Sequence, residues 1–356
     1  MVDAPPIACD QYFEYLELFD GVVVGQARPN AKVVCNATII DLGGLIVVVD
    51  AHSRPSAARA VIDFVRRSFD SPVDYVVNTH HHWDHCQGNA AYAEQQTPAV
   101  ILAHPNAIDA MRAGIHKPID AQLAELPAEL ARLDAALTGL TAAASPVTAD
   151  ADRLAVATDI EQVRQYAAEL PLIRRALPDR AVDAPLTLAG TRREIRVVHP
   201  GPAHTQGDLI VQLPGDDAVA TGDCVIGWTP FMGDSHPGHW AAALDVIADG
   251  PAGTLLMGHG RPADRRWLRT FQRYLADVVA ETARCASPGR RGEDVARDTR
   301  ARLADRYRAA FDREGGRHRP WDALVLRNVR HVYGLLSTGA WDACAEPSGQ
   351  WRRSRG

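Results

Sequence analysis

Short runs of β-branched residues recur along this chain, and they constrain its fold more than any other feature. They read "LIVVVD" at residues 45–50, "VDYVVN" at residues 73–78 and "PAVILAH" at residues 98–104. Apolar runs of this length are typical of strands that are buried in a sheet. Apolar residues at helical spacing separate the first two runs, over residues 53–69, and Ser56 is expected to cap that helix. This order predicts an α/β fold in which helices cover a sheet.

The composition is that of an ordinary globular protein with a sizeable core. Hydrophobic residues make up 46% of the 356 residues and charged residues 23%. The formal net charge is -6 at pH 7, so no overall positive field attracts nucleic acid or an acidic membrane. We therefore expect neither nucleic acid nor a membrane as a partner.

The N-terminus and the cysteines both favour a cytoplasmic location. Residues 1–21 lack a positive segment followed by an apolar core, so no secretory signal is expected. The most apolar run, "GGLIVVVDA", is far too short to span a bilayer. The six cysteines are scattered without a CxxC motif, which favours reduced thiols.

Strand and helix signals alternate unevenly along the chain. The pair Gly43 and Gly44 between two β-branched runs predicts a hairpin. Ala/Leu-rich stretches broken by proline predict a helical insertion over residues 105–184. One α/β domain is expected over residues 1–280 and a helical extension over residues 281–356. The insertion could be a lid over an active site or a dimer interface, and homo-oligomers could form through it or through the C-terminal helices.

Four clusters of polar residues follow apolar runs, where strands are expected to end. They read "THHHWDH", "GPAHTQGD", "TGDCV" and "MGHG", at residues 79–85, 201–208, 221–225 and 257–260. Imidazole and carboxylate groups without a thiolate suit Zn²⁺, and also Fe or Mn. Because alternate residues of an extended segment point the same way, His80 and His82 can hold one metal. Asp84 and His85 would then face a second position.

In this order and context, the clusters resemble the metallo-β-lactamase superfamily. Its signature is H-x-H-x-D-H followed by later His, Asp and His motifs. Here residues 80–85 read "HHHWDH", and "AHTQGD", "TGD" and "GHG" follow. The resemblance covers roughly residues 18–275, interrupted by the insertion. It implies a four-layer αβ/βα sandwich with metals at one edge, to which the helical insertion and the helical C-terminal extension are added.

The resemblance also implies a binuclear metal site. One metal would be held by His80, His82 and His204, the other by Asp84, His85 and His259, and Asp223 would bridge both. Two divalent ions about 3.5–4 Å apart lower the pKa of a water that they share, which gives a hydroxide near neutral pH. Zn²⁺ is the expected metal, with Fe or Mn as alternatives. Asp84 is also the candidate catalytic residue, because it could orient the nucleophile.

Three further residues are expected to support the ligands. Asp50 ends a predicted strand where the family usually has an aspartate, although a plain strand-end cap explains it equally well. Thr205 and Asp208 are expected to hold the loop that carries His204. Small residues beside the ligands, Gly222, Gly258 and Gly260, would let the backbone pass close to the metals.

Several other histidines are assigned roles other than metal binding. His81 lies on the opposite phase from its two neighbours, so it should brace the loop or shape the pocket rim. His52 is either a local specificity feature or a surface histidine. His104, His116 and His199 are expected to be structural.

Aromatic and apolar residues near the motifs predict the substrate pocket. Residues 227–240, "GWTPFMGDSHPGHW", would form an apolar wall with a few polar groups. The candidate substrate-binding residues are Trp83 in the histidine cluster and Trp228, Phe231, Met232 and His236 in this segment. Trp240 is explained equally well by packing of the segment on the core.

The aspartate at position 223 narrows the expected chemistry. Members that hydrolyse β-lactams with a cysteine ligand place it where Asp223 stands, and Cys224 is expected to be a buried thiol. An aspartate bridge resembles the glyoxalase II, lactonase and thioesterase-like branches. The leading hypothesis is therefore a binuclear metal hydrolase whose partner is a small-molecule substrate and which cleaves a carbonyl-centred bond: ester, lactone, thioester or amide. A diiron oxygen-dependent redox enzyme is the alternative; β-lactamase activity and a non-catalytic scaffold are less favoured.

Overall fold

The structure is a computed structural model that describes residues 4–28, 32, 35–114, 118–142, 146–287, 289–315 and 321–340. The chain divides into two compact units. The first unit comprises residues 5–102 and 108–180, and the second comprises residues 1–4, 103–107 and 181–356. His116, Cys344 and the basic tail lie outside the described residues. The predicted boundary between residues 280 and 281 stays a prediction.

An eight-stranded sheet forms the centre of the first unit, with its strands in chain order. The strands are β1 (Pro6–Cys9), β2 (Phe13–Phe19), β3 (Val22–Ala27), β4 (Ala37–Asp41), β5 (Ile46–Val49), β6 (Tyr75–Val77), β7 (Val100–Ala103) and β8 (Arg180–Ala181). Strands β1 to β5 pair antiparallel, whereas β5, β6 and β7 pair parallel. The predicted glycine hairpin joins β4 to β5, with φ of 83° at Gly43 and 96° at Gly44.

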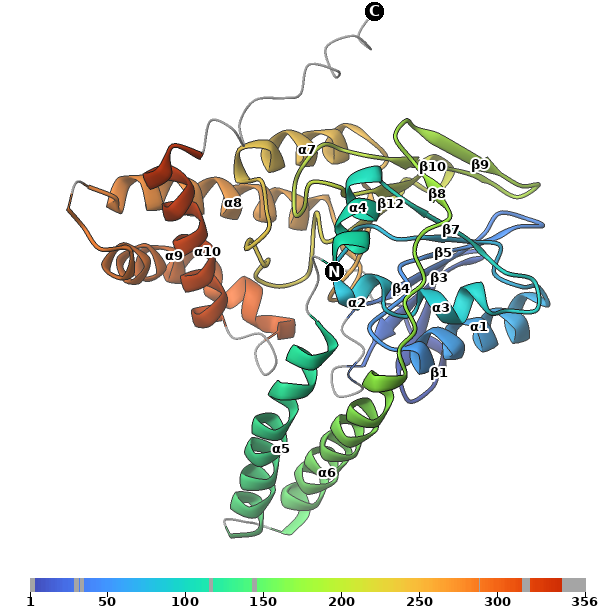
Figure 1. The fold of residues 1–356 in the computed structure, drawn as a ribbon, viewed down its shortest axis with the longest axis horizontal. Coiled ribbons are helices and arrows are strands. Elements are labelled where there is room, and N and C mark those ends of the chain that lie inside the picture. Colours follow the sequence, from blue (N-terminus) through green and yellow to red (C-terminus); the bar gives the residue numbers. More distant parts are fainter. Residues whose placement is uncertain are drawn as a thin grey trace, which may run out of the picture. The chain divides into compact units, whose positions relative to one another are not determined.

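Helices connect the parallel strands of this sheet, because a chain that forms two parallel neighbours must cross over between them (Figure 1). Helix α1 (Pro55–Phe69) links β5 to β6, and the short helices α2 (Trp83–Cys86) and α3 (Asn89–Ala93) link β6 to β7. The buried face of α1 includes Val61 and Val65, four residues apart. Phe64 of the same helix stacks on Tyr15 of β2 with ring centroids 3.8 Å apart. Apolar spacing therefore forms this layer, as predicted.

The predicted insertion is helical. It contains α4 (Pro105–Ala113), α5 (Ile119–Ala142), α6 (Pro146–Glu169) and a short 3₁₀ turn at Leu170–Leu172. Helices α5 and α6 lie side by side as a hairpin (Figure 1). Near its base the hairpin has its own small core, formed by Leu126, Val163, Tyr166 and Leu170, and Trp83 of α2 packs against it. The histidine-bearing segment and the insertion are thus in contact within the first unit.

A buried arginine ties the insertion to the sheet. Arg54, whose exposed fraction is 2%, donates from Nε to Glu169 Oε2 at 2.8 Å, and its guanidinium lies over the rings of Tyr12 and Tyr166. The predicted cap at Ser56 is wrong, because α1 begins one residue earlier, at Pro55. Instead Ser56 donates to Glu169 from both its backbone N–H and its hydroxyl, at 2.6 and 2.7 Å. The carboxylate of α6 therefore caps the positive end of α1.

A six-stranded sheet forms the centre of the second unit, in the order β14-β13-β12-β11-β10-β9. The strands are β9 (Leu186–Ala189), β10 (Glu194–Val198), β11 (Ile210–Leu213), β12 (Ala218–Gly222), β13 (Thr254–Met257) and β14 (Ala263–Asp264), with a 3₁₀ turn at Pro214–Asp216. Only β12 and β13 pair parallel; the other neighbours are antiparallel. Two of the polar clusters found in the sequence follow this parallel pair directly.

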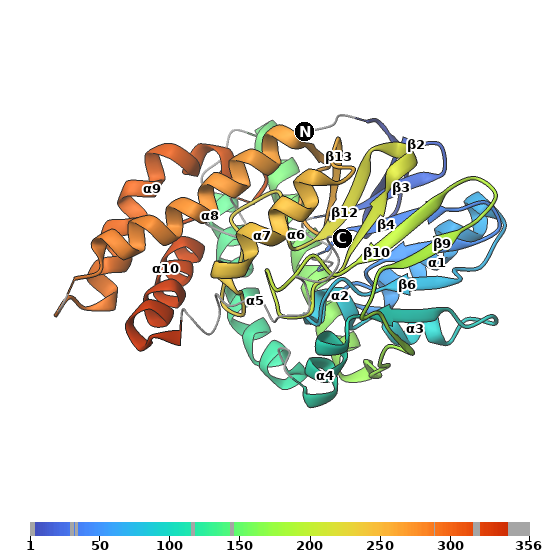
Figure 2. The same cartoon turned by 90° about the horizontal axis from the view of Figure 1, so that it is seen from above.

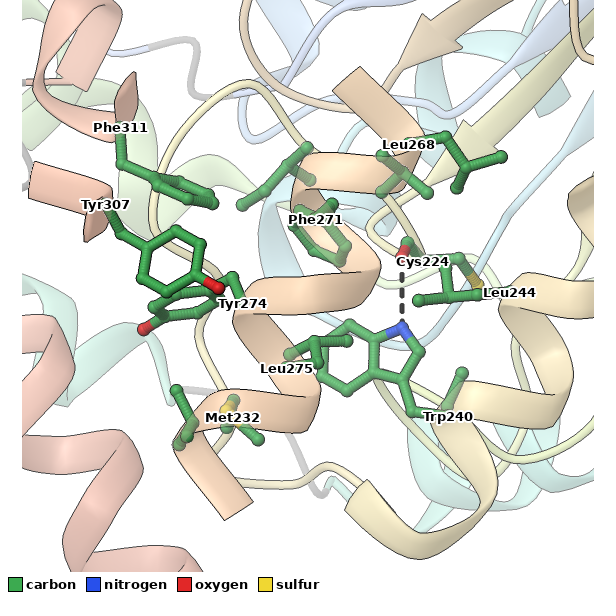
Figure 3. Close-up of a cluster of buried hydrophobic side chains, with 14 of the residues drawn as sticks. Cys224, Met232, Trp240, Leu244, Leu268, Phe271, Tyr274, Leu275, Tyr307 and Phe311 are labelled. Atoms are coloured by element: carbon green, nitrogen blue, oxygen red, sulfur yellow. Dashed lines mark hydrogen bonds between the residues drawn. The ribbon is translucent and has the colours of Figure 1, made fainter. Parts of the chain in front are cut away.

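Four helices accompany this sheet: α7 (Pro237–Asp249), α8 (Arg265–Cys285), α9 (Gly292–Gly315) and α10 (Trp321–Thr338). Helices α7 and α8 pack their apolar faces with residues of β12 and β13 in one core (Figure 2). Asp264 caps α8 by accepting from the backbone N–H groups of Arg266 and Trp267. Aromatic rings of α8 and α9 interlock in the core, among them Phe271, Tyr274 and Phe311 (Figure 3). The predicted C-terminal extension is therefore helical in its described part and shares the core of this unit.

None of the helices among the described residues is long and apolar enough to cross a membrane.

Removing the Glu169 carboxylate should destabilise the first unit. In Glu169→Ala, the buried guanidinium of Arg54 loses the Glu169 carboxylate, which costs about 3–5 kcal/mol of the free energy of unfolding. Urea unfolding followed by circular dichroism measures the difference from the unchanged protein.

The matched control for this change is Asp109→Ala. Asp109 pairs with Arg112 on α4, and both side chains are more than half exposed, at 74% and 62%. That pair should contribute no more than about 0.5 kcal/mol. Equal, small losses in both variants would contradict the role assigned to Glu169.

Candidate metal centre

The histidine cluster follows β6 of the first unit, at the carboxyl end of the parallel strands. The backbone bends at His80 and His81, is extended at His82, where ψ is 146°, and then turns into the helix α2. Asn78 braces this change of direction, since its Nδ2 donates to the carbonyl oxygen of His85 at 3.1 Å. His80 and His85 are fully buried, Asp84 is 6% exposed, and His82 is half-buried. The predicted ligands of this segment are thus held in an ordered, largely buried turn.

Ligand atoms crowd together within this turn. A ring nitrogen of His80 lies within 4.8 Å of one of His82 and of one of His85. The Oδ2 atom of Asp84 is 3.8 Å from His85 Nε2. Polar side chains that are buried in a protein interior are normally hydrogen-bonded, paired with an opposite charge or bound to a metal ion. Several donor atoms so close together fit a positive ion, and the first unit brings four predicted ligands to one place.

In burial and in the position of its ring nitrogens, His81 resembles the predicted ligands His80 and His82 more than strict alternation of side chains predicts. It is also buried, at 7% exposed, and one of its ring nitrogens lies within 4.8 Å of one of His82. Distance within the first unit therefore does not separate His81 from His82. The choice of His82 as the ligand stays a prediction from the family signature.

The carboxylate of Asp50 organises the turn from behind. Its Oδ2 accepts from His85 Nδ1 at 2.8 Å, and its Oδ1 accepts from the backbone N–H of Thr79, also at 2.8 Å. A carboxylate can only accept here, so His85 carries its proton on Nδ1 and presents the lone pair of Nε2. Asp50 is 2% exposed and has a φ of 69°, a conformation that few non-glycine residues adopt. Such a carboxylate–histidine pair is the usual support for a metal-binding imidazole.

Thr79, whose role was not predicted from the sequence, extends this support to a second histidine. The Thr79 hydroxyl donates to Asp50 Oδ2 at 3.0 Å and lies 3.0 Å from His80 Nδ1. Since the hydroxyl proton goes to the carboxylate, its oxygen accepts from Nδ1, and Nε2 of His80 is left as the ligand atom. A hydroxyl residue directly before the first histidine of the signature was the available signal.

Below the turn, His52 has a structural role that neither sequence interpretation anticipated. It is fully buried with a φ of 66°; its Nδ1 lies 3.4 Å from Cys35 Sγ and its Nε2 lies 3.3 Å from the Tyr92 hydroxyl. Burial, with a smaller effect from His85, lowers the pKa of His52 to about 3. Cys35 in turn donates to the backbone carbonyl of Asp84 at 2.8 Å. His52 therefore belongs to the packing beneath the turn and is not a surface residue.

The second unit brings three other predicted ligands together. Asp223 Oδ2 lies 3.5 Å from His204 Nε2 and 3.2 Å from His259 Nε2, and all three residues are at most 7% exposed. Asp223 follows β12 and His259 follows β13, which explains their proximity because the two strands are parallel neighbours. One carboxylate oxygen between two imidazole nitrogens is the arrangement that a bridging or shared ligand requires.

A glycine makes room for this carboxylate. A Cβ atom at Gly258 would lie 2.6 Å from Asp223 Oδ1, so only glycine fits beside it. Gly222, just before the aspartate, has a φ of 50°, which glycine adopts without strain. The close approach at Gly258 and the positive φ at Gly222 explain why glycine occurs at both positions beside Asp223.

The loop before β11 is held by its own hydrogen bonds. Asp208 accepts from the backbone N–H of Thr205 at 2.9 Å and from its hydroxyl at 2.8 Å. The Thr205 hydroxyl also accepts from the N–H of Gly207 at 3.2 Å. His204 therefore stands on a rigid loop, as the sequence analysis expected of Thr205 and Asp208.

Aromatic residues surround the ligands of the second unit. The ring of Trp228 lies 5.1 Å from that of His259, and Phe231 lies 6.3 Å from His204, edge to face. Met232 differs from these two, since it is fully buried in the hydrophobic core. An apolar wall of this segment would therefore be formed by Trp228 and Phe231.

Trp240 packs in the core, whereas the role predicted for His236 at the substrate stays a prediction. Trp240 is fully buried, lies edge to face with His204 at a ring-centroid distance of 5.7 Å, and donates from Nε1 to the carbonyl of Cys224 at 3.0 Å (Figure 3). His236 is half-buried, and burial together with His239 and His331 lowers its pKa. Its backbone N–H donates to Ala203 at 2.8 Å, next to the ligand loop.

Each unit thus offers a donor set suited to a divalent cation. The donors are imidazoles and carboxylates, which suit Zn²⁺, Fe and Mn alike. Burial raises the pKa of the Cys224 thiol, and the side chain packs in the core, so this neighbour of Asp223 is a poor source of thiolate. The residues present therefore fit nitrogen and oxygen coordination.

His104 and His199 form a separate pair in the second unit. Their rings stack with centroids 4.1 Å apart. His104 Nδ1 accepts from the N–H of Asn106, and His199 Nδ1 donates to the carbonyl of Asp208 at 2.7 Å. Burial and the neighbouring His199 lower the pKa of His104 to about 4, and burial also lowers the pKa of His199. Both rings are neutral in the folded protein and serve packing, as expected.

Replacing Asp50 should weaken metal binding without unfolding the protein. Asp50→Asn keeps the shape but removes the charge behind His85, so metal affinity should fall about 10- to 100-fold. Competition with a chromophoric chelator measures the affinity for Zn²⁺ and Co²⁺. Asp63→Asn, on the exposed face of α1, is the control and should bind as the unchanged protein does. Equal affinity in the Asp50 variant would exclude this support.

The histidine pair should make the protein acid-sensitive. The folded pKa of His104 lies below the ordinary value of 6.5, so the unfolded chain binds more protons and stability falls as pH drops from about 6.5 to about 4. The loss from this residue should be about 1 kcal/mol or less, because the rings are partly exposed. Urea unfolding of His104→Phe between pH 4 and 7 should show a shallower decrease; an unchanged slope would contradict this cause.

Comparisons with known proteins agree with this fold. A family model described as the metallo-beta-lactamase superfamily matches residues 31–259. No curated protein matches the sequence significantly. Solved structures that resemble the chain include a metallo-beta-lactamase from Pontibacter korlensis, with a TM-score of 0.52 and 15% identity over 74% of this chain and 99% of that one.

Two further solved structures show the same likeness. One is a metallo-beta-lactamase from Erythrobacter litoralis, with a TM-score of 0.52 and 15% identity over 76% of this chain and 99% of that one. The other is FIM-1 from Pseudomonas aeruginosa, with a TM-score of 0.50 and 17% identity over 74% of this chain and 95% of that one. At such low identity the likeness of these structures shows the fold alone. That likeness confirms the predicted fold class. Since the family match covers more than half of the chain, this protein belongs to the metallo-β-lactamase superfamily.

Proposed function

We propose that this chain is a metal-dependent hydrolase that cleaves a carbonyl-centred bond of a small molecule, an ester, lactone, thioester or amide. The observation that carries the proposal is the position of Asp223, whose carboxylate oxygen lies between the ligand nitrogens of His204 and His259. A carboxylate here, with Cys224 buried in the core, favours oxygen and nitrogen ligands over thiolate.

The ligands of both units would hold the same two divalent cations, as the order of the family motifs implies. His80, His82, Asp84 and His85 would come from the first unit, and His204, Asp223 and His259 from the second. When bound, such cations supply Lewis acidity and a nucleophile derived from water at neutral pH. Zn²⁺ is the proposed metal, because hydrolysis requires no change of oxidation state and Zn²⁺ has no redox chemistry.

Asp84 is the proposed catalytic residue. Its carboxylate is nearly buried and lies 3.8 Å from His85 Nε2, while the bond from Cys35 to its backbone carbonyl holds it in place. From this position the carboxylate can orient a nucleophile, accept its proton, and return a proton to the leaving group. Asp50 and Thr79 keep the neighbouring imidazoles in the required tautomer.

The substrate side of the site would be apolar. Trp228 and Phe231 lie beside two of the proposed ligands, His259 and His204, and both aromatic residues are only half-buried. Such a wall suits the hydrocarbon part of an acyl group or a lactone ring. Trp83, which packs between the histidine turn and the insertion, is the proposed contact from the first unit.

Metal analysis of adjacent histidine variants tests the ligand assignment. The purified protein should contain about two zinc ions per chain by elemental analysis. His82→Ala should lose a large part of this metal, whereas His81→Ala should keep it, although the two residues are neighbours in one turn. Loss of metal in the His81 variant would contradict the assignment. Stoichiometric iron with oxygen consumption would instead favour the diiron alternative.

Turnover of Asp223→Asn tests the chemistry. A panel of chromogenic ester, lactone, thioester and β-lactam substrates should identify a substrate for the unchanged protein. For that substrate, kcat/KM should fall by about 10²-fold or more, as when a group that stabilises developing charge is removed. Asp245→Asn, on the exposed face of α7, is the control and should keep full activity. Retained activity in the Asp223 variant would exclude the proposed centre.

A further inference from the structure

The C-terminal helix α10 holds the segment of the second unit that carries Phe231. Helix α10 covers residues 321–338, whereas the family match ends at residue 259. The contacts between this added helix and residues 230–235 are polar and specific. The helix therefore does more than fill space behind the core.

Asn328 makes the central contacts. Its side chain is fully buried, its Nδ2 donates to the carbonyl of Pro230 at 2.8 Å, and its Oδ1 accepts from the backbone N–H of Met232 at 3.1 Å. The two bonds hold the backbone on either side of Phe231. The same Nδ2 is 3.4 Å from the Tyr274 hydroxyl in the aromatic core, which ties the amide to α8. One amide group thus determines the path of this segment.

Two further contacts hold the ring of Phe231 itself. The Arg327 guanidinium lies over the ring, 4.3 Å from its centroid. On the backbone side the ring folds over Gly233, where a Cβ atom would lie 2.2 Å from Cζ of Phe231. One turn further along α10, His331 Nε2 is 3.1 Å from the carbonyl of Ser235. The ring is therefore confined by residues before, after and above it.

We infer that α10 is a positioning element that sets the acyl specificity of the site. Asn328, Arg327 and Gly233 hold Phe231 edge-on to His204, with ring centroids 6.3 Å apart. A rigid ring at that distance from a proposed ligand limits the size of the group that fits there. The inference rests on the proposed hydrolase function for its consequence, but the positioning itself does not depend on turnover.

Hydrogen exchange tests the positioning without any substrate. In Asn328→Ala, the amide of Met232 loses its hydrogen bond and should exchange roughly 2- to 10-fold faster, which corresponds to the net contribution of one such bond. Mass spectrometry of the peptide that covers residues 227–236 in the full-length protein measures this change. Arg330→Ala is the matched control on the same helix, because Arg330 pairs with Glu293 at 2.6 Å and not with this segment. Unchanged exchange in the Asn328 variant would overturn the inference.

Substrate selection tests the consequence. We expect Asn328→Ala and Gly233→Ala each to raise kcat/KM for p-nitrophenyl phenylacetate relative to p-nitrophenyl acetate about 10-fold, with unchanged metal content. Gly233→Ala displaces the ring directly and leaves α10 intact, so agreement between the two variants separates positioning from a general loss of stability. In a Phe231→Ala background, neither change should alter the ratio further, because the residue through which they act is gone.

The outcomes separate the two proposals. An equal loss of kcat on both esters, without a change in their ratio, would show a merely structural role for Asn328 and overturn the specificity inference. If the unchanged protein turns over neither ester nor any other substrate of the panel, the hydrolase proposal fails. The exchange measurement then still decides whether α10 holds the Phe231 segment.

Discussion

The hydrogen bond from His85 Nδ1 to Asp50 is the interaction on which the histidine turn depends. Asp50 stands at the end of β5 in a left-handed conformation that few residues adopt without compensation. The compensation is visible in its three accepted bonds, from His85 and from both the backbone and the hydroxyl of Thr79. Because those bonds also set the tautomers of His85 and His80, the carboxylate of Asp50 determines which nitrogen atoms are offered to a metal.

Both helical additions act on segments that carry predicted site residues. In the first unit the insertion packs against Trp83 and is held by the buried contact between Arg54 and Glu169. In the second unit α10 holds the segment around Phe231 through Asn328. The strands carry the ligands and the added helices contact the aromatic neighbours, which is a common way to vary specificity on a conserved scaffold.

Much of the fold and of the site could be predicted, because strand ends and metal ligands leave strong local signals. The glycine hairpin, the helical insertion and the grouping of the histidine cluster could all be predicted from residue types and from the spacing of apolar and ligand residues. Ser56 shows where local rules fail, since its role depends on Glu169, which lies 113 residues further along the chain. Thr79 and His52 were missed or misjudged for the same reason: their partners are distant in sequence.

The sequence by itself determined the chemistry that is available, namely the order of strands and helices, the imidazole and carboxylate motifs, and an aspartate at position 223. Those properties depend on residue type and short-range spacing. Only the tertiary structure decided which atoms meet within each unit. Asp50 bonds His85, and the Asp223 carboxylate lies between His204 and His259. Asn328 bonds the backbone before and after Phe231. Such contacts depend on strand pairing and helix packing, so no local pattern specifies them.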